Sequence, residues 1–187
     1  MNFPFSFLER ISNEKILWLQ KEASSENGKI NQNQIKKGNL KMKIRDMVLS
    51  DKEQVMEMVN EFYHSDAVDH EVKPEILEAT LDAAISSDPI LRGLILEEDG
   101  KIVGYAYLTS YFVTEAGGIN LMIEDIFIKK EARGHGYGKQ FFQWLFKEYP
   151  NVKRYRLEVT EENKGAVSLY KKMGFEFLGY LQMIKDI

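Results

Sequence analysis

The fold is decided by the stretch Ile123-Glu124-Asp125-Ile126-Phe127-Ile128-Lys129-Lys130-Glu131-Ala132-Arg133-Gly134-His135-Gly136-Tyr137-Gly138-Lys139. It begins with a nearly continuous apolar run, which predicts a strand covered on both faces. A basic turn and alternating glycines follow, at the start of an aromatic-rich helix that we expect to run to Tyr149. The glycines expose backbone N–H groups where the helix begins, and a helix start attracts anions. The stretch therefore predicts an anion site, with phosphate as the obvious guest.

Length and composition favour one domain with an extension. The chain has 187 residues, of which 44% are hydrophobic, enough for one sizeable core. Residues 1–40 combine a short apolar helix pattern with a polar linker, so they are interpreted as an N-terminal extension. The globular pattern, and therefore the predicted domain, covers 41–187.

Charge and cysteine content exclude several classes of protein. The absence of cysteine excludes disulfides and a cysteine nucleophile, and it fits a reducing compartment, so we expect the cytoplasm. The net charge is −4, and the acidic balance of the main domain argues against a nucleic-acid partner. No apolar run has the length of a membrane span, so no membrane partner is expected.

Working outward from the opening stretch, periodicity predicts strands followed by alternating helices and strands. Such an order is typical of the α/β class, here a mixed sheet with helices on both faces. The predicted elements are a strand at 41–47, helices at 51–64 and from 74, strands at 90–97, 101–113 and 123–128, a helix to 149, a strand at 152–159, a short helix with Asn163 as its N-cap, and a last strand or strand pair at 175–184.

The glycine loop has three other interpretations. Glu158 stands where a Rossmann fold places its ribose-binding acid, but the spacing here is G-x-G-x-G rather than G-x-G-x-x-G. The Walker pattern is absent. A glycine-rich turn without a ligand is the remaining alternative, and the glycines alone do not exclude it.

A second cluster of residues narrows the choice. The run from Arg133 to Gly138 has the form [Q/R]-x-x-G-x-[G/A], and an N-x-x-A-x-x-x-Y-x-x-x-G-F pattern starts at Asn163. Together they resemble the GCN5-related N-acetyltransferase (GNAT) superfamily over about residues 42–187. The resemblance implies the acyl-CoA N-acyltransferase fold, in which the sheet splays beside the opening strand.

The resemblance implies acetyl-CoA as co-substrate and no metal. The pantetheine arm would pair with strand backbone, and the glycine loop would wrap the pyrophosphate. His135 is interpreted as a cofactor-side contact, not a base. The cofactor-binding residues that the resemblance implies are Ile126, Phe127, Ile128, Arg133, Gly134, His135, Gly136, Tyr137, Gly138, Lys139, Asn163 and Ala166.

Two residues are predicted to be catalytic. Tyr170 matches the tyrosine that the family places near the CoA sulfur, where a phenol can donate a proton. Its alternative role is an ordinary core residue. Glu124 is interpreted as a base or substrate carboxylate on the face of Ile126, with a strand-end salt bridge as the alternative. Asp125 is expected to face the other way and to be structural. Without cysteine, acetyl transfer is expected to be direct.

The acceptor is predicted to be a small cationic amine, because the segment from Ile123 to Ile128 is similar to the diamine and spermidine/spermine acetyltransferase branch. Tyr63 and Asp66, in the polar loop at 63–70, are the predicted substrate-binding residues besides Glu124. The loop's histidines match no metal motif. Acetylation of a protein N-terminus or lysine, and a CoA-binding regulatory module without turnover, stay open. A homodimer, paired through residues 175–177, is a further expectation.

Overall fold

The computed structural model describes residues 42–185, except 66, 69 and 87–89. The predicted N-terminal extension, residues 1–40, lies outside the described residues. Within the described part, no helix has the length and apolar character needed to cross a membrane.

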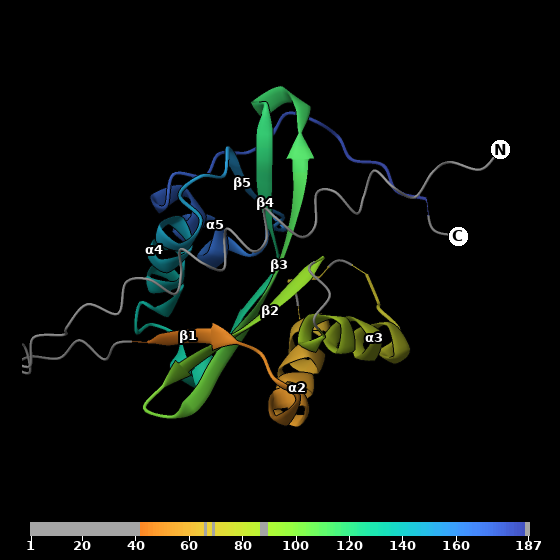
Figure 1. Ribbon diagram of the computed structural model, residues 1–187, viewed down its shortest axis with the longest axis vertical. Coiled ribbons are helices and arrows are strands. Elements are labelled where there is room, and N and C mark those ends of the chain that lie inside the picture. Colours follow the sequence, from red (N-terminus) through yellow and green to blue (C-terminus); the bar gives the residue numbers. More distant parts are fainter. Residues whose placement is uncertain (1–41, 66, 69, 87–89, 186–187) are drawn as a thin grey trace, which may run out of the picture. The chain divides into compact units, whose positions relative to one another are not determined.

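From β1 to α5, the described strands and helices follow the predicted order (Figure 1). Pro74 occupies the first turn of its helix, where its missing N–H costs nothing. The elements are β1 (Lys43–Asp46), η1 (Leu49–Asp51), α2 (Lys52–Tyr63), α3 (Pro74–Ile85), β2 (Leu91–Glu98), β3 (Lys101–Val113), η2 (Thr114–Ala116), β4 (Gly118–Ile128), η3 (Lys130–Ala132), α4 (Tyr137–Glu148), β5 (Arg154–Leu157) and α5 (Lys164–Lys172).

The strands form one mixed sheet in the order β1-β2-β3-β4-β5. The first four strands pair antiparallel, and β4 pairs parallel with β5. Hydrophobic side chains cover both faces of the sheet. One core cluster joins the sheet to α4, and the other joins it to α2 and α3. The predicted mixed sheet with helices on both faces is therefore confirmed.

A bulge in β4 decides where its acidic side chains point. Ile123 pairs with Leu108 and Asp125 pairs with Tyr107, so Glu124 is an extra residue without a partner on β3. A bulge interrupts the strict alternation of side chains and redirects those beside it.

The predicted strand or strand pair at 175–184 is wrong. This segment has no regular secondary structure after α5. Phe175 packs against the core cluster around α4, whereas Leu181 and Met183 are 97% and 96% exposed. An apolar run forms a strand only where a neighbouring strand satisfies its backbone, and this run has no such neighbour among the described residues.

Candidate active site

The sheet opens beside the stretch that decides the fold. β4 and β5 pair only from Asn120 to Ile123 on β4, opposite residues 154–157. Beyond Ile123, β4 continues to Ile128 with β3 as its only partner within the described sheet. The splayed sheet that the resemblance implied is present, and it leaves one edge of β4 unpaired.

The unpaired edge presents particular backbone groups. Lys129 donates its N–H to Val103 O on the β3 side at 2.9 Å. Successive strand residues alternate in direction, so the N–H and C=O of Ile126 and Ile128 point away from β3. The C=O of Ile128 accepts a hydrogen bond from Arg133 Nε at 2.9 Å. The N–H and C=O of Ile126 are left facing the gap, whereas the groups of Phe127 face β3.

The glycines of the loop have two different structural tasks. Gly134 and Gly136 have φ values of 83° and 81°, in the left-handed region that other residues rarely adopt. Gly138 lies instead where α4 meets α5, because a Cβ there would come within 2.6 Å of Leu169 Cδ2. The loop conformation and the placement of α5 therefore both depend on glycine.

The start of α4 offers unpaired donors. The Gln140 N–H donates to Gly136 O at 3.0 Å, so the N–H groups of residues 137–139 precede the helical hydrogen bonds. Lys139 and Lys130 are exposed close by in the sequence, and the partial positive charge of the helix start adds to theirs. An anion with several oxygens suits this position.

The side chains around the loop mostly support its shape. The Arg133 guanidinium lies 5.7 Å from the Phe127 ring centroid, in addition to its bond to the end of β4. His135 contacts Ala132 O through Nδ1 at 3.1 Å and stacks on the Tyr137 ring. The side chains of Phe127 and Tyr137 are buried in the core. Any ligand contact of Tyr137 is therefore made by its backbone.

The start of α5 is capped as predicted. Asn163 Oδ1 accepts a hydrogen bond from the Ala166 N–H at 3.2 Å, which confirms Asn163 as the N-cap. One face of the helix carries Tyr170, whose ring packs against Phe142 and Phe175. Burial raises the pKa of the Tyr170 hydroxyl to about 12, so the phenol stays protonated near neutral pH.

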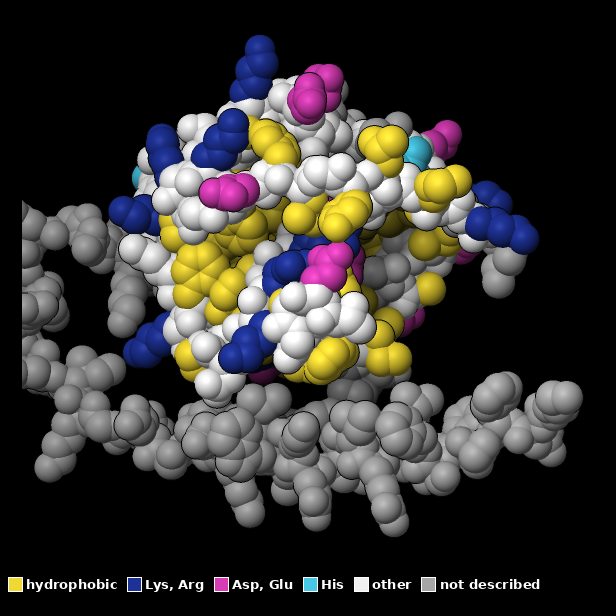
Figure 2. Space-filling model, turned by 90° about the horizontal axis from the view of Figure 1, so that it is seen from above, with side chains coloured by type: hydrophobic (Ala, Val, Ile, Leu, Met, Phe, Trp, Pro, Cys, Tyr) yellow, Lys and Arg dark blue, Asp and Glu magenta, His cyan; other side chains and the backbone are white. Residues whose placement is uncertain are grey.

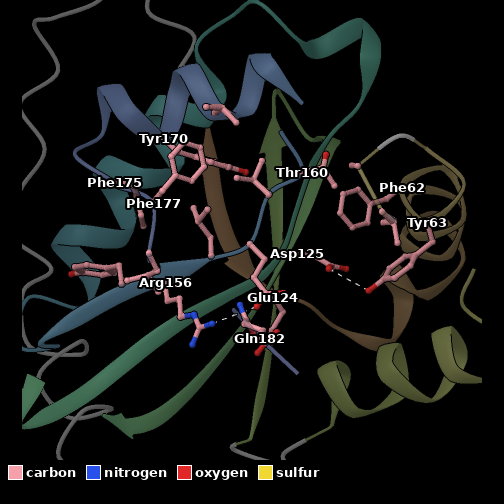
Figure 3. A pocket seen from close by; sticks show the side chains of 18 of the residues that line it. Phe62, Tyr63, Glu124, Asp125, Arg156, Thr160, Tyr170, Phe175, Phe177 and Gln182 are labelled. Carbon is pink, nitrogen blue, oxygen red and sulfur yellow. Dashed lines mark hydrogen bonds and ion pairs between the residues drawn. The ribbon is translucent and has the colours of Figure 1, made fainter. Parts of the chain in front are cut away.

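A large cavity of about 1290 Å³ lies beside the gap. It is lined by the end of α2, the following loop, α3, β4, β5, α5 and the C-terminal segment. Tyr170, Glu124, Asp125 and Tyr63 all line it, so the structure brings most of the predicted catalytic and acceptor residues together (Figure 3). Asp66 lies outside the described residues.

The expectation that Asp125 faces away from Glu124 is wrong, because both carboxylates line this cavity. The bulge is the physical reason. Glu124 is exposed and accepts a hydrogen bond from the Thr109 hydroxyl on β3. Thr109 is two residues from Tyr107 on β3, so Glu124 lies on the face of Tyr107 rather than on that of Ile126.

Of the two acids, Asp125 has the more unusual environment. It is only 5% exposed, and its oxygens accept hydrogen bonds from Tyr63 at 3.3 Å and from Tyr105 at 3.2 Å. Burial raises the pKa of the Asp125 carboxyl to about 6; the tyrosine hydrogen bonds lower this pKa and the nearby Glu124 charge raises it.

Sequence reasoning missed Asp125 and its hydrogen-bond partner Tyr105 as residues of the site. One signal was available, because Tyr105 and Tyr107 are two residues apart on a strand and so share a face. The position of the bulge had no comparable signal. Within the described residues, no group of three or more His, Asp or Glu side chains could hold a metal ion.

Comparisons with known proteins agree with this geometry. A model of the acetyltransferase (GNAT) family matches residues 53–175. The chain is 29% identical over 147 residues to the thialysine N-epsilon-acetyltransferase of Mus musculus, covering 73% of this chain and 85% of that protein. It is 30% identical over 139 residues to the putative ribosomal protein bS18 alanine N-acetyltransferase of Bacillus subtilis, covering 73% and 82%.

A solved structure shows the same fold. The aminoglycoside N-acetyltransferase AAC(6')-Iy, determined in complex with CoA, superposes with a TM-score of 0.62 at 17% identity, over 78% of this chain and 94% of that one. The chain belongs to the GNAT acetyltransferase family, and it is an acetyl-CoA-dependent N-acetyltransferase.

Proposed function

We propose that the enzyme transfers the acetyl group of acetyl-CoA directly to a primary amine of a small cationic acceptor, of the diamine or polyamine kind. The observation that carries this proposal is the pair of carboxylates at the bulge of β4. Glu124 and Asp125 line a cavity beside the gap that suits the cofactor, with Tyr63 and Tyr170 in the same lining. Acids and aromatic rings are the groups that receive an ammonium ion.

The proposed cofactor position follows the backbone. The pantetheine arm pairs with the open N–H and C=O of Ile126, and with the N–H of Ile128, along the unpaired edge of β4. The pyrophosphate occupies the loop at 133–139 and the start of α4. Phe127 contributes indirectly, since its backbone faces β3. Asn163 and Ala166 hold the start of α5 against the cofactor arm. No metal takes part in this proposal.

Two chemical tasks remain for side chains. The acceptor ammonium must lose a proton before its nitrogen attacks the thioester, and the exposed carboxylate of Glu124 can pass that proton to water. The chain has no cysteine, so no acyl-cysteine forms. Collapse of the tetrahedral intermediate releases the CoA thiolate, which Tyr170 meets as a hydrogen-bond donor.

The pKa of Tyr170 limits its role. At about 12, it lies well above the value of about 8.5 that is typical of a thiol. Complete proton transfer from this phenol to the thiolate is therefore unfavourable. Tyr170 stabilises the leaving thiolate with a hydrogen bond, and the second proton of the amine neutralises the sulfur.

A second candidate function is acetylation of a protein N-terminus or lysine. One observation favours it: the described cavity lining carries basic side chains such as Lys153, Arg154 and Arg156 as well as acids. Seen from above, the surface likewise mixes acidic, basic and hydrophobic side chains (Figure 2). The Bacillus subtilis relative is named for a protein substrate. A CoA-binding module without turnover is the remaining alternative.

The deciding experiment is free-thiol release from acetyl-CoA across a panel of acceptors. The panel holds putrescine, spermidine, lysine, thialysine, an aminoglycoside and a basic peptide. The proposal expects the highest kcat/KM for a small diamine or polyamine. Preference for the peptide would move the assignment to protein acetylation, and CoA binding without turnover on any acceptor would favour the regulatory module.

We also propose a cytoplasmic homodimer. The absence of cysteine suits a reducing compartment. β5 is the last strand of the described sheet, and the segment after α5 exposes Phe177, Tyr180 and Leu181. The free strand edge of one copy and the exposed apolar segment of a second copy can pair with each other. Sedimentation of the full chain, compared with a chain that ends at Glu176, tests this: the shortened chain is expected to be a monomer.

A further inference from the structure

We propose that Asp125 is the carboxylate that receives the acceptor's ammonium group. This inference rests on the proposed acetyl transfer to a cationic amine and assigns the residue that selects the cation. It gives the two acids of the bulge different roles: Asp125 binds the ammonium group, and Glu124 passes the proton of that group to water.

The charge of Asp125 has no counter-ion within the described part of the chain. Its carboxylate is buried, and no ion pair in the described part of the chain includes it. Taking a charge out of water costs free energy that a counter-ion in the same place can recover. An ammonium ion that enters the cavity would be that counter-ion.

Several titratable groups surround Asp125. Tyr63 from α2, Tyr105 from β3 and Glu124 from β4 act on the pKa of its carboxyl. Burial and the nearby Asp125 charge raise the pKa of the Tyr105 and Tyr107 hydroxyls, so both stay protonated and neutral. The remaining titratable groups of the described lining include His70, Glu71 and Lys73 before and at the start of α3, Lys153, Arg154, Arg156 and Glu158 on or beside β5, and Lys171 and Glu176 on or after α5.

Asp125 can accept further hydrogen bonds. Each of its carboxylate oxygens accepts one bond from a tyrosine, Oδ1 from Tyr63 and Oδ2 from Tyr105. Each oxygen can accept more than that one bond, and an ammonium group has three N–H donors. The two Asp125 oxygens therefore supply acceptors for those donors.

Tyr63 lies beside Asp125. Its hydroxyl points to Asp125 from the end of α2 at the wall of the cavity (Figure 3). Its ring stacks edge-on against Phe62, which lines the same wall. An aromatic wall beside a carboxylate favours a cation through the ring quadrupoles as well as through charge.

A pH dependence follows from the geometry. The pKa of Asp125 is about 6 in the free protein, and an ammonium ion binds the ionised form. The kcat/KM for the amine should therefore fall tenfold per pH unit below about 6, while the acetyl-CoA KM stays constant. The bound cation should in turn lower the pKa of Asp125, because it favours the charged form.

The first test needs no turnover. The full chain is labelled with 13C at the aspartate carboxyls, and the Asp125 signal is titrated by NMR with and without saturating putrescine, in the absence of acetyl-CoA. We expect a midpoint near 6 that falls by at least one pH unit with the diamine. A midpoint that putrescine does not move would overturn the inference, even if the enzyme is active. A shifted midpoint without any turnover would support the inference while refuting the proposed function.

The second test is kinetic and compares variants of the two acids with a control. Asp125→Asn should raise the amine KM roughly 30-fold and remove the acid limb near pH 6, and Asp125→Glu should recover part of the loss. Glu124→Gln should lower kcat and keep that limb. Tyr107→Phe is the control: it removes a buried hydroxyl next to Asp125 that is outside the described cavity lining, and it should leave the amine KM close to wild type. An unchanged amine KM in Asp125→Asn would overturn the inference.

Discussion

The two sides of β4 bind their proposed ligands in different ways. On the cofactor side, the unpaired edge of β4, the loop at 133–139 and the start of α4 present backbone groups. On the acceptor side, the same strand presents the side chains of Glu124 and Asp125 to a cavity lined with tyrosine. The cofactor side is built from N–H groups that folding leaves unpaired, whereas the acceptor side holds a buried acid that folding must accommodate.

The two sides should therefore be impaired by different kinds of substitution. A backbone site depends on φ values and helix placement, so only substitutions that change the chain path should disturb it. A side-chain site depends on individual carboxylates and hydroxyls, so isosteric changes should suffice. The predictions below use this contrast.

The largest effect is expected for Gly136→Val. Gly136 has a φ of 81°, and a β-branched residue there must shift the loop. Misplacing the pyrophosphate donors should lower kcat/KM for acetyl-CoA roughly 100-fold, and the amine KM should change little. Initial rates at varied acetyl-CoA measure this.

Gly100→Val is the matched control. Gly100 has a φ of 76° in the β2–β3 hairpin, and a Cβ there has open space. The Gly100→Val substitution should lower the free energy of unfolding by about 1–2 kcal/mol, because it introduces the same backbone strain. It should not change the acetyl-CoA KM. Equal kinetic losses in both variants would mean that strain, not the anion site, explains the effect.

Asp125→Asn should stabilise the folded protein at neutral pH. The folded pKa of Asp125, about 6, is raised above the unfolded value of about 3.9, so ionised Asp125 costs about 3 kcal/mol above pH 6. The wild type has its full stability contribution from this group below pH 4 and loses it as pH rises through 6. Urea unfolding should show the variant more stable by about that amount at pH 8, with no gain near pH 4. A pH-independent difference would contradict the raised pKa.

Tyr170→Phe should lower kcat by roughly tenfold to 100-fold, because a hydrogen bond to a charged group is lost. Both KM values should stay close to wild type, since the ring still packs against Phe142 and Phe175. The wild-type kcat should show no loss between pH 7 and 9 from this phenol, whose pKa is about 12. Full turnover by the variant would remove the proposed role.

The smallest effect is expected for Glu124→Gln. This side chain is exposed, so water can take over part of its task. We expect kcat to fall roughly threefold to tenfold without a change in the amine KM, measured by steady-state rates with putrescine. A larger rise in amine KM here than in Asp125→Asn would reverse the assignment of the two acids.

The same contrast explains how much could be predicted from the sequence. The start of α4 after the glycines and the Asn163 cap are local features, because a few adjacent residues determine them, and both were predicted correctly. The orientation of Asp125 was not, because it depends on a bulge that forms only when β3 and β4 pair. Likewise, the apolar run after Phe175 could not reveal that no neighbouring strand would pair with it.

The most direct test of the account is an amide NMR titration of 15N-labelled protein with CoA. We predict large shifts at Ile126 and at residues 134–139, and small ones at Tyr63 and in α3. Shifts confined to the end of α2 and the cavity, with the loop and the β4 edge unchanged, would contradict the proposed division between a backbone-built cofactor side and a side-chain-built acceptor side.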